Sequence, residues 1–314
     1  MHSLNLPLEP RSLYDPIRYA LQNGGKRLRP QLTLLGSSLC GGDSKMAVPA
    51  ALAVELLHNF TLIHDDIMDS ADTRRNKPSV FKKWDSSTAI LSGDVLFAHS
   101  IEQLEFYGKD DRYSKEQYLA IHQTFREAVV MVCQGQALDM EFESREDVTL
   151  DDYMKMINAK TAALLSCALK LGALVALAPQ IQVDTASALG YHAGIGFQIQ
   201  DDLLDAVGDS KKFGKNIGGD IREGKKTWLT IAAFNKASDE QKKVLNFVLN
   251  SEAPGQDEID DIIRLYHELN VIVEAQEVIS NHYKLARKCL QQFENSAHRN
   301  EINNLLDQLM VRES

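Results

Sequence analysis

The sequence predicts an all-α protein built as one large helical domain spanning residues 1–314. Apolar residues recur with helical spacing over long segments, whereas alternating patterns long enough for β-strands are absent. Between Ala50 and Ala253 only Pro78 and Pro179 occur, and both stand at breaks between these segments. Several segments are apolar around most of their circumference, which indicates central helices surrounded by others. We therefore expect a single bundle of about ten or more helices, with the central ones around a deep cavity.

The expected helices follow one another without a linker or low-complexity tract. Pro49 suits the first turn of the first long segment, and Thr149, followed by two acids, suits a helix N-cap. The long segments are Ala47–Asp69, Ser87–Tyr107, Lys115–Ser144, Thr149–Ala178, Thr185–Asp209 and Lys226–Ala237. Amphipathic helices then continue to the C-terminus, with polar connections near Ala237–Glu240 and Ala253–Asp257.

Composition and charge exclude several classes of protein. The net charge of −10 leaves no basic surplus to neutralise phosphates, so we expect no nucleic-acid partner. The N-terminus lacks a signal-peptide pattern, and no apolar run reaches the length needed to cross a bilayer. The longest candidate, Thr161–Ala178, contains Lys170 and is expected to be a core helix. Cys133 and Cys167 lie in apolar segments without CxxC spacing, so we expect reduced core thiols in a cytoplasmic protein.

Two aspartate clusters share the pattern Asp-Asp-x-x-Asp. They are "DDIMD" (Asp65, Asp66, Asp69) and "DDLLD" (Asp201, Asp202, Asp205). Each ends an otherwise apolar helical segment, where negative charge opposes the helix dipole, so a merely solvated acidic face is the weaker interpretation. Mg²⁺ prefers oxygen ligands and is typically held by one or two carboxylates together with substrate phosphates. The clusters therefore predict Mg²⁺ bound around a diphosphate, and the EF-hand spacing of calcium sites is absent.

Basic residues accompany both clusters. "GGKRLRP" (Gly24–Pro30) precedes the first cluster, Arg74 and Arg75 follow it, and "FGKNIGGDIREGKK" (Phe213–Lys226) follows the second. A single basic pair is more often a surface charge, but Arg forks and Lys charges are the usual diphosphate contacts, and the arrangement is repeated. "GDIREGKK" is not a P-loop, because Lys226 stands where Ser or Thr is needed and no strand precedes it.

With these motifs the chain resembles the trans-type isoprenyl diphosphate synthases, the polyprenyl synthetase family. The resemblance extends from "GGKRLRP" to about Trp228, with "DDIMD" similar to the family's first aspartate-rich motif and "GIGFQIQDDLLD" similar to its second. It implies an isoprenoid synthase-like fold and a Mg²⁺-dependent prenyltransferase of the short-chain type. Such an enzyme condenses isopentenyl diphosphate with an allylic diphosphate by ionisation, condensation and elimination. The resemblance also implies a homodimer, for which Ser87–Phe106 is a candidate interface.

The resemblance implies a role for each matching residue. Two Mg²⁺ on the allylic diphosphate would be bound by Asp65, Asp69 and Asp139, supported by Asp66. A third would be bound by Asp201, with Asp202 and Asp205 as partners mostly through water. The allylic diphosphate would be contacted by Arg74, Lys160, Lys215 and Lys225. Isopentenyl diphosphate would be held by Lys26, Arg29, His58 and Arg75. Thr161 and Gln198 would direct oxygen dipoles at the allylic carbocation, with Gln136 beside them.

Lys160 and the loop after the first motif need separate consideration. Lys160 lies within an apolar helical run, where an ammonium is costly without an anion, although its side chain could instead extend to solvent. The loop after the first motif reads "RRNKPS", with Asn76 and Ser79 where the family usually has Gly and Thr. Asn tolerates the left-handed conformation better than most residues, so we expect the turn to form but to be stiffer.

Phe60 and Thr61 are the candidate determinants of product length. Thr61 lies four residues before Asp65, one helical turn away on the same face, and Phe60 is beside it. In the family a large side chain here blocks elongation, so the pair resembles enzymes that stop at twenty carbons, with fifteen as the alternative. Phe60 could also serve core packing alone. A terpene cyclase and a non-catalytic subunit of a heteromeric synthase remain alternative functions, both disfavoured because the acidic and basic motifs are retained.

Overall fold

The computed structural model describes residues 6–22, 24–208, 218–251 and 253–310, which are predominantly helical. The chain divides into two compact units. Unit 1 comprises Met1–Val129 and Cys167–Asp184, and unit 2 comprises Val130–Ser166 and Thr185–Ser314. The boundaries fall within helices α7 (Lys115–Ser144), α9 (Ala163–Val175) and α10 (Gln180–Val207). The expected all-α fold is confirmed, whereas a single domain stays a prediction.

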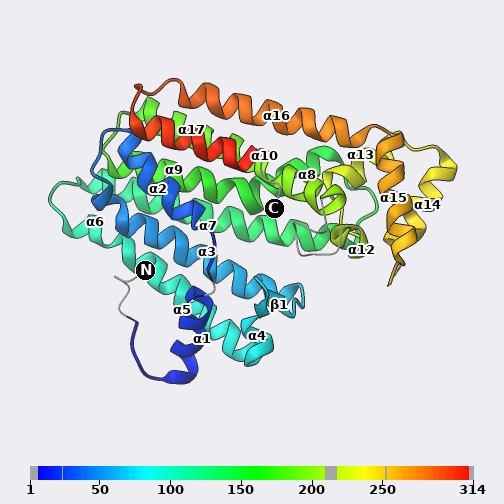
Figure 1. Ribbon diagram of the computed structural model, residues 1–314. Helices are drawn as coiled ribbons and strands as arrows, with labels where there is room; N and C mark the ends of the chain where they lie inside the picture. The colour runs from blue at the N-terminus through cyan, green and yellow to red at the C-terminus, as the bar shows by residue number, and fades with distance from the viewer. Residues whose placement is uncertain (1–5, 23, 209–217, 252, 311–314) are drawn as a thin grey trace. The chain divides into compact units, whose positions relative to one another are not determined.

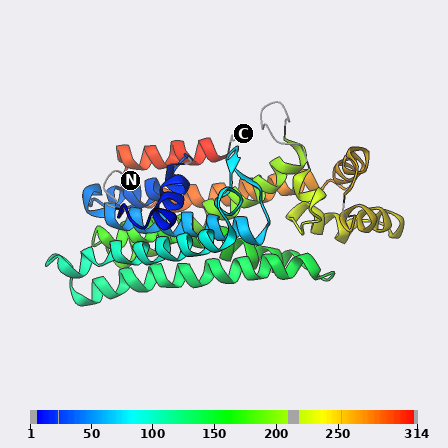
Figure 2. The same cartoon turned by 90° about the horizontal axis from the view of Figure 1, so that it is seen from below.

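Unit 1 is organised around helices α3 (Val48–Met68) and α5 (Ser86–Leu104), which lie side by side (Figure 1) and remain so in the turned view (Figure 2). Ile17, Leu56 and Leu96 have no exposed surface and join these helices to α1. Burying each such side chain contributes about 1.5–3 kcal/mol. The other elements are α1 (Arg11–Gln22), α2 (Leu28–Leu39), a 3₁₀ turn (Ser44–Ala47), β1 (Thr73–Arg74), β2 (Lys77–Pro78), α4 (Val80–Lys83) and α6 (Phe106–Lys109).

Unit 2 contains the second half of α7, most of α10 and the C-terminal helices. α17 (Ala297–Met310) packs along α16 (Val271–Leu290), as Figure 1 shows. The core includes fully buried Tyr266 and Tyr283. The other elements are α8 (Leu150–Ile157), a π-helical segment (Asn158–Ala162), α12 (Gly219–Arg222), α13 (Trp228–Lys236), α14 (Asp239–Leu249) and α15 (Gln256–Glu268).

Local sequence signals set several helix ends. Pro49 lies in the first turn of α3, and Asp85 caps α5 by accepting a hydrogen bond of 2.8 Å from the Thr88 backbone N–H. The predicted N-cap at Thr149 is confirmed, because Thr149 and Asp152 form a reciprocal capping box. The bounds of α7 match the predicted segment Lys115–Ser144.

The predicted helix Thr149–Ala178 is interrupted by the π-helical segment between α8 and α9. Gly135 on α7 approaches this segment so closely that an added Cβ would lie 2.2 Å from the Lys160 backbone nitrogen. Only glycine permits this approach. π-helical turns are rare and often occur at functional sites, and this one carries Lys160 and Thr161.

In the described part of the chain, two helical stretches are long and apolar enough to span a membrane by length and composition alone. They are Ser44–Met68, whose most apolar window is 56% buried, and Leu150–Val175, whose window is 72% buried. The sequence argument that no apolar run reaches this length was therefore wrong. Core helices of soluble proteins meet the same test, and the burial of these two supports that interpretation.

The four cysteines are free thiols, but they differ in exposure. Cys167 is buried as expected, whereas Cys133 is exposed, so its assignment to the core was wrong. Val130, one turn earlier on α7, is also exposed, at 48%. Apolar neighbours in the sequence therefore do not guarantee burial, because successive helical residues point in different directions.

Candidate functional site

The first aspartate cluster forms the C-terminal end of α3, as predicted. Asp65 is half-buried, Asp69 is exposed at the helix C-cap, and Asp66 is only 3% exposed. Asp66 accepts hydrogen bonds from Arg74 Nε at 2.8 Å and Nη2 at 2.6 Å. Burial raises the pKa of Asp66, and the Arg74 hydrogen bond partly offsets this. Asp66 therefore holds Arg74, while Asp65 and Asp69 lie one turn apart at the helix end.

Strands β1 and β2 form a short antiparallel hairpin that carries both arginines of the "RRNKPS" loop. Thr73 pairs with Pro78, and Arg74 pairs with Lys77. The two turn residues are left-handed, with φ of 53° at Arg75 and 60° at Asn76, as in a type I′ turn. The prediction that Asn76 supports this turn is confirmed. Arg75 adopts the same left-handed conformation, which Asn and Gly tolerate better than other residues. For arginine this conformation costs about 1–2 kcal/mol.

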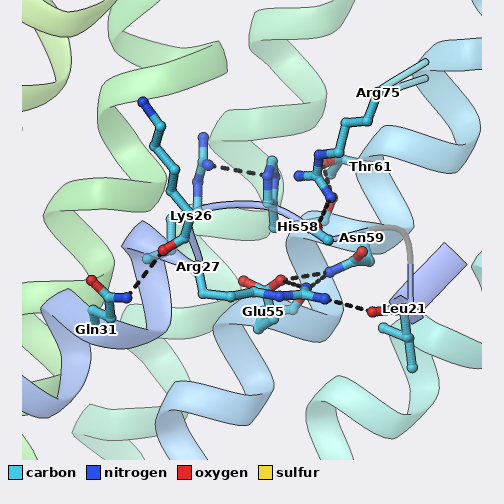
Figure 3. Close-up of polar contacts among 11 residues, drawn as sticks. Leu21, Lys26, Arg27, Gln31, Glu55, His58, Asn59, Thr61 and Arg75 are labelled. Carbon is cyan, nitrogen blue, oxygen red and sulfur yellow. Dashed lines mark hydrogen bonds and ion pairs between the residues drawn. The ribbon is translucent and has the colours of Figure 1, made fainter. Parts of the chain in front are cut away.

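The loop before α2 uses its two basic residues, Lys26 and Arg27, differently (Figure 3). Arg27 donates to the buried carboxylate of Glu55 and, at 2.5 Å, to the Leu21 carbonyl. Asn59 also donates to Glu55 Oε1, at 2.9 Å. The Lys26 side chain extends away from this group in Figure 3. Arg27 thus anchors the loop by an ion pair that sequence reasoning missed, although a lone Glu within the apolar α3 segment was a signal for it.

Arg29 on α2 and His58 on α3 meet, with Arg29 Nη1 and His58 Nε2 3.1 Å apart. Arginine can only donate, so His58 accepts at Nε2 and carries its proton on Nδ1. Burial and the surrounding arginines hold the pKa of His58 well below its usual range. Burial also lowers the pKa of Arg29 to about 10, with Glu55 opposing the shift. A buried cationic group of this kind favours an anionic ligand.

Arg75 completes the cationic group in unit 1. Its guanidinium donates to the Gly24 carbonyl. It also packs against Gly25, where φ is +125° and an added Cβ would lie 2.8 Å from Arg75 Cζ. The predicted isopentenyl diphosphate residues Lys26, Arg29, His58 and Arg75 therefore lie on one loop, two helices and one hairpin of the same unit.

In unit 2, Lys160 projects from the π-helical segment and donates to Asp139 on α7. The two side chains are 28% and 29% exposed, respectively. Lys160 thus finds an anionic partner inside the protein, and the alternative of a side chain extended to solvent is not what the structure shows. Gln136, one turn before Asp139, is 8% exposed, and neither polar atom of its amide has a hydrogen-bond partner.

Thr161, beside Lys160, belongs to a chain of hydrogen bonds. Its Oγ1 donates to Gln198 Oε1 at 2.7 Å, and Gln198 Nε2 donates to Asp202 Oδ1 at 2.9 Å. Tyr153 donates to Asp202 Oδ2 at 2.6 Å. Burial raises the pKa of Asp202, with a further contribution from Asp220. Asp202 is thereby engaged on both oxygens, while its neighbour Asp201 is exposed.

Asp220 extends the second acidic cluster next to Asp205. Asp205 accepts from the Asp220 backbone N–H at 2.7 Å. Burial and the nearby Asp205 carboxylate raise the pKa of Asp220. Lys225 Nζ lies 3.5 Å from Asp220 and 2.7 Å from Glu223. Asp220 was missed from the sequence, although it stands in the singled-out "GGDIREGKK" loop. Lys215, the remaining predicted residue, lies outside the described residues.

The acidic residues fit a hard divalent cation. The crowding that raises the pKa of Asp202 and Asp220 would be relieved by positive charge. Within the described ranges, no three His, Cys, Asp or Glu side chains come together as a complete metal site. In proteins, Mg²⁺ is typically held by one or two carboxylates together with substrate phosphates.

The candidate product-length residues lie on α3 in unit 1. The half-buried Phe60 ring contacts His64, with centroids 4.7 Å apart, and Phe97 on α5 at 5.3 Å. Thr61 Oγ1 donates back to the His58 carbonyl at 2.9 Å. Thr61 is therefore a small residue whose hydroxyl is already satisfied, and Phe60 is the bulky one.

Comparisons with known proteins agree with this chemistry. The family model Polyprenyl synthetase matches residues 10–266. The chain is 37% identical over 307 residues to a short chain isoprenyl diphosphate synthase of Methanothermobacter thermautotrophicus, covering 98% of this chain and 92% of the relative. It is 45% identical over 237 residues to a geranylgeranyl diphosphate synthase of Saccharolobus solfataricus, covering 74% of this chain and 70% of the relative.

A solved structure of geranylgeranyl pyrophosphate synthetase from Pyrococcus horikoshii is also similar. It matches with a TM-score of 0.91 and 35% sequence identity, covering 97% of this chain and 91% of that chain. Since the family model spans most of the sequence and a relative aligns over nearly all of it, the chain belongs to the polyprenyl synthetase family.

Proposed function

We propose that this chain is a short-chain prenyltransferase that condenses isopentenyl diphosphate with allylic diphosphates and releases geranylgeranyl diphosphate. The observation that carries the proposal is that Arg29 and Gln136 have buried polar atoms without partners. Among the described residues these atoms are Arg29 Nε and both polar atoms of the Gln136 amide, and Ser37 Oγ and His122 Nε2 are in the same condition. Buried polar groups are rarely left without a partner. Arg29 and Gln136 are residues to which the resemblance assigns substrate contacts, whereas Ser37 and His122 are not.

The residues of unit 1 suit binding of a diphosphate. Lys26, Arg29 and Arg75 provide donors for phosphate oxygens, and neutral His58 keeps Arg29 in place by accepting its hydrogen bond. We assign these four residues to isopentenyl diphosphate. Arg74, oriented by Asp66, is assigned to the allylic diphosphate. Orienting side chains before the substrate arrives reduces the cost of binding.

The residues of unit 2 suit ionisation of an allylic ester. Lys160 and Lys225 provide positive charge for the departing diphosphate, and Lys215 is assigned the same role from the sequence. Thr161 and Gln198 provide oxygen dipoles for the carbocation, whose quenching by the second substrate requires that water be excluded. When bound, about three Mg²⁺ ions, held by Asp65, Asp69, Asp139, Asp201 and Asp205, supply the positive charge that neutralises the leaving group. The released diphosphate takes the final proton, so no protein nucleophile is needed.

The proposal includes a homodimer and a cytoplasmic location. Ile90, Leu91 and Ile101 on α5 are 45%, 58% and 38% exposed in the single chain. Exposed apolar residues gathered on one helix are typical of an interface. They support the expectation that Ser87–Phe106 lies between two copies.

The test is to incubate the purified protein with Mg²⁺, isopentenyl diphosphate and allylic primers of different lengths. We expect extension that stops at twenty carbons and is abolished by a chelator. Asp69→Asn should lose activity by about 100-fold or more, because a proposed metal ligand is removed. Asp72→Asn is the matched control. Asp72 is an exposed aspartate nearby whose carboxylate pairs with Lys82 at 2.9 Å, and this variant should remain active.

Each alternative function gives a different product. Termination at fifteen carbons would identify a farnesyl diphosphate synthase. A cyclised hydrocarbon would indicate a terpene cyclase. Absence of turnover until a partner protein is added would indicate a subunit of a heteromeric synthase.

A further inference from the structure

The hydrogen-bonded chain in unit 2 begins at a side chain that is almost completely buried. Tyr153 on α8 is 1% exposed and donates to Asp202 Oδ2 on α10 at 2.6 Å. Figure 1 labels both helices. Asp202 Oδ1 accepts from Gln198, and Gln198 accepts from Thr161. One tyrosine hydroxyl is therefore connected, through two other side chains, to the threonine that follows Lys160.

The order of donors and acceptors along these hydrogen bonds determines how the Thr161 hydroxyl is oriented. Tyr153 and Gln198 each donate to a different oxygen of Asp202. With its NH₂ group turned toward Asp202, Gln198 presents its carbonyl oxygen to Thr161. Thr161 then donates to that carbonyl. The hydroxyl hydrogen of Thr161 is thereby directed at Gln198, and its lone pairs remain available for positive charge.

We propose that Tyr153 is a positioning residue for prenyl transfer, which holds Asp202 so that Gln198 and Thr161 present oxygen dipoles to the allylic cation. The inference rests on the proposed function. Tyr153 is too deeply buried to touch the substrate and acts only through Asp202. Without its hydroxyl, one Asp202 oxygen loses its donor, and the carboxylate is free to rotate away from Gln198. The Gln198 amide then loses the acceptor that holds its carbonyl oxygen toward Thr161.

The alternative is a purely structural role, in which the Tyr153 hydroxyl only provides a hydrogen bond to the buried Asp202 carboxylate. Tyr283 provides the matched control, because it has no exposed surface and its hydroxyl donates at 3.1 Å to Gln200, also on α10. Tyr283→Phe removes one buried hydroxyl that donates to a different side chain of the same helix. Tyr153→Phe removes the hydroxyl that donates to Asp202. Both substitutions retain the ring and its packing.

We expect Tyr153→Phe to lower kcat by about 10- to 100-fold, the range typical when the support of a catalytic group is removed. KM for both substrates should stay within about twofold, because ground-state binding is unaffected. Tyr283→Phe should retain the kcat of the unmodified protein. Thr161→Val should make the enzyme insensitive to a further Tyr153→Phe change, since the two residues act through one chain. Additive losses, or equal losses in the two tyrosine variants, would overturn the proposal.

A second measurement separates this proposal from the proposed function. The side-chain amide resonances of Gln198 can be followed by NMR in isotope-labelled protein, with Gln198→Glu to assign them. We expect them to change in Tyr153→Phe and not in Tyr283→Phe. Unchanged resonances would refute the positioning role whatever the activity. Changed resonances in a protein that does not elongate prenyl chains would refute the proposed function and leave the positioning of Gln198 standing.

Discussion

At the scale of single residues, Glu55 supplies the negative charge that the arginines of unit 1 require. Its side chain is only 5% exposed, and it accepts from both Arg27 and Asn59. Burial lowers the pKa of Arg29 and of Arg75, and Glu55 opposes both shifts, so it favours the charged form of two proposed substrate ligands. A buried carboxylate in this position neutralises Arg27 and leaves the other arginines to an incoming anion.

Glu55→Gln should lower the free energy of unfolding by about 3 kcal/mol, because breaking a buried ion pair leaves one charge unpaired. Arg27→Met should cost a similar amount. The double variant should lose less than the two single losses together, since neither charge is then stranded. Urea unfolding of the four proteins measures this. Strict additivity would mean that the pair contributes no coupling.

At the scale of elements, the β1–β2 hairpin determines where Arg74 and Arg75 project. Its ends are tied to other parts of unit 1. Tyr19 on α1 donates to the Pro78 carbonyl at 2.8 Å, and Arg74 binds Asp66 on α3. The turn itself depends on two residues with positive φ, neither of them glycine. The hairpin is thus anchored on both strands and strained at its tip.

The substitutions Asn76→Ala and Asn76→Gly test this strain directly. Alanine disfavours the left-handed conformation, so Asn76→Ala should destabilise the protein by about 1 kcal/mol and raise KM for isopentenyl diphosphate by displacing Arg75. Asn76→Gly should retain stability and KM, because glycine adopts this conformation freely. Unfolding curves and steady-state kinetics on both variants provide the measurement. Equal behaviour of the two variants would contradict a role for the turn conformation.

An element can be predicted from the sequence when the residues that determine it are its own neighbours in the chain. α7 was predicted to the residue because its polar ends and apolar period are local. The π-helical segment was not predicted, because Asn158–Ala162 has an ordinary helical composition and the residue that packs closely against it, Gly135, lies on another helix. Contacts between distant segments were missed because the partner of each residue lies far away in the sequence. Glu55 meets Arg27 across 28 positions, and Tyr153 meets Asp202 across 49.

At the scale of the whole molecule, motifs proved more informative than composition. The repeated aspartate clusters and their basic loops identified the family, which the comparisons confirm. By length and hydropathy alone, two helical stretches of the described chain qualify as candidate membrane spans. The structure adds how much of each stretch is buried. We expect the length of the product to depend on how much space lies one turn below Asp65.

Phe60→Ala should lengthen the product beyond twenty carbons, because it removes the ring that contacts His64 and Phe97 one turn below the first cluster. Phe81→Ala is the matched control, since Phe81 on α4 packs against the same hydrophobic cluster as Phe60 but does not precede Asp65 on α3. Both variants should be less stable, as expected for loss of a large apolar side chain. Mass spectrometry of the prenyl products separates them: longer chains from Phe60→Ala alone support the assignment. An unchanged product from Phe60→Ala, or equal lengthening in both variants, would assign Phe60 to core packing.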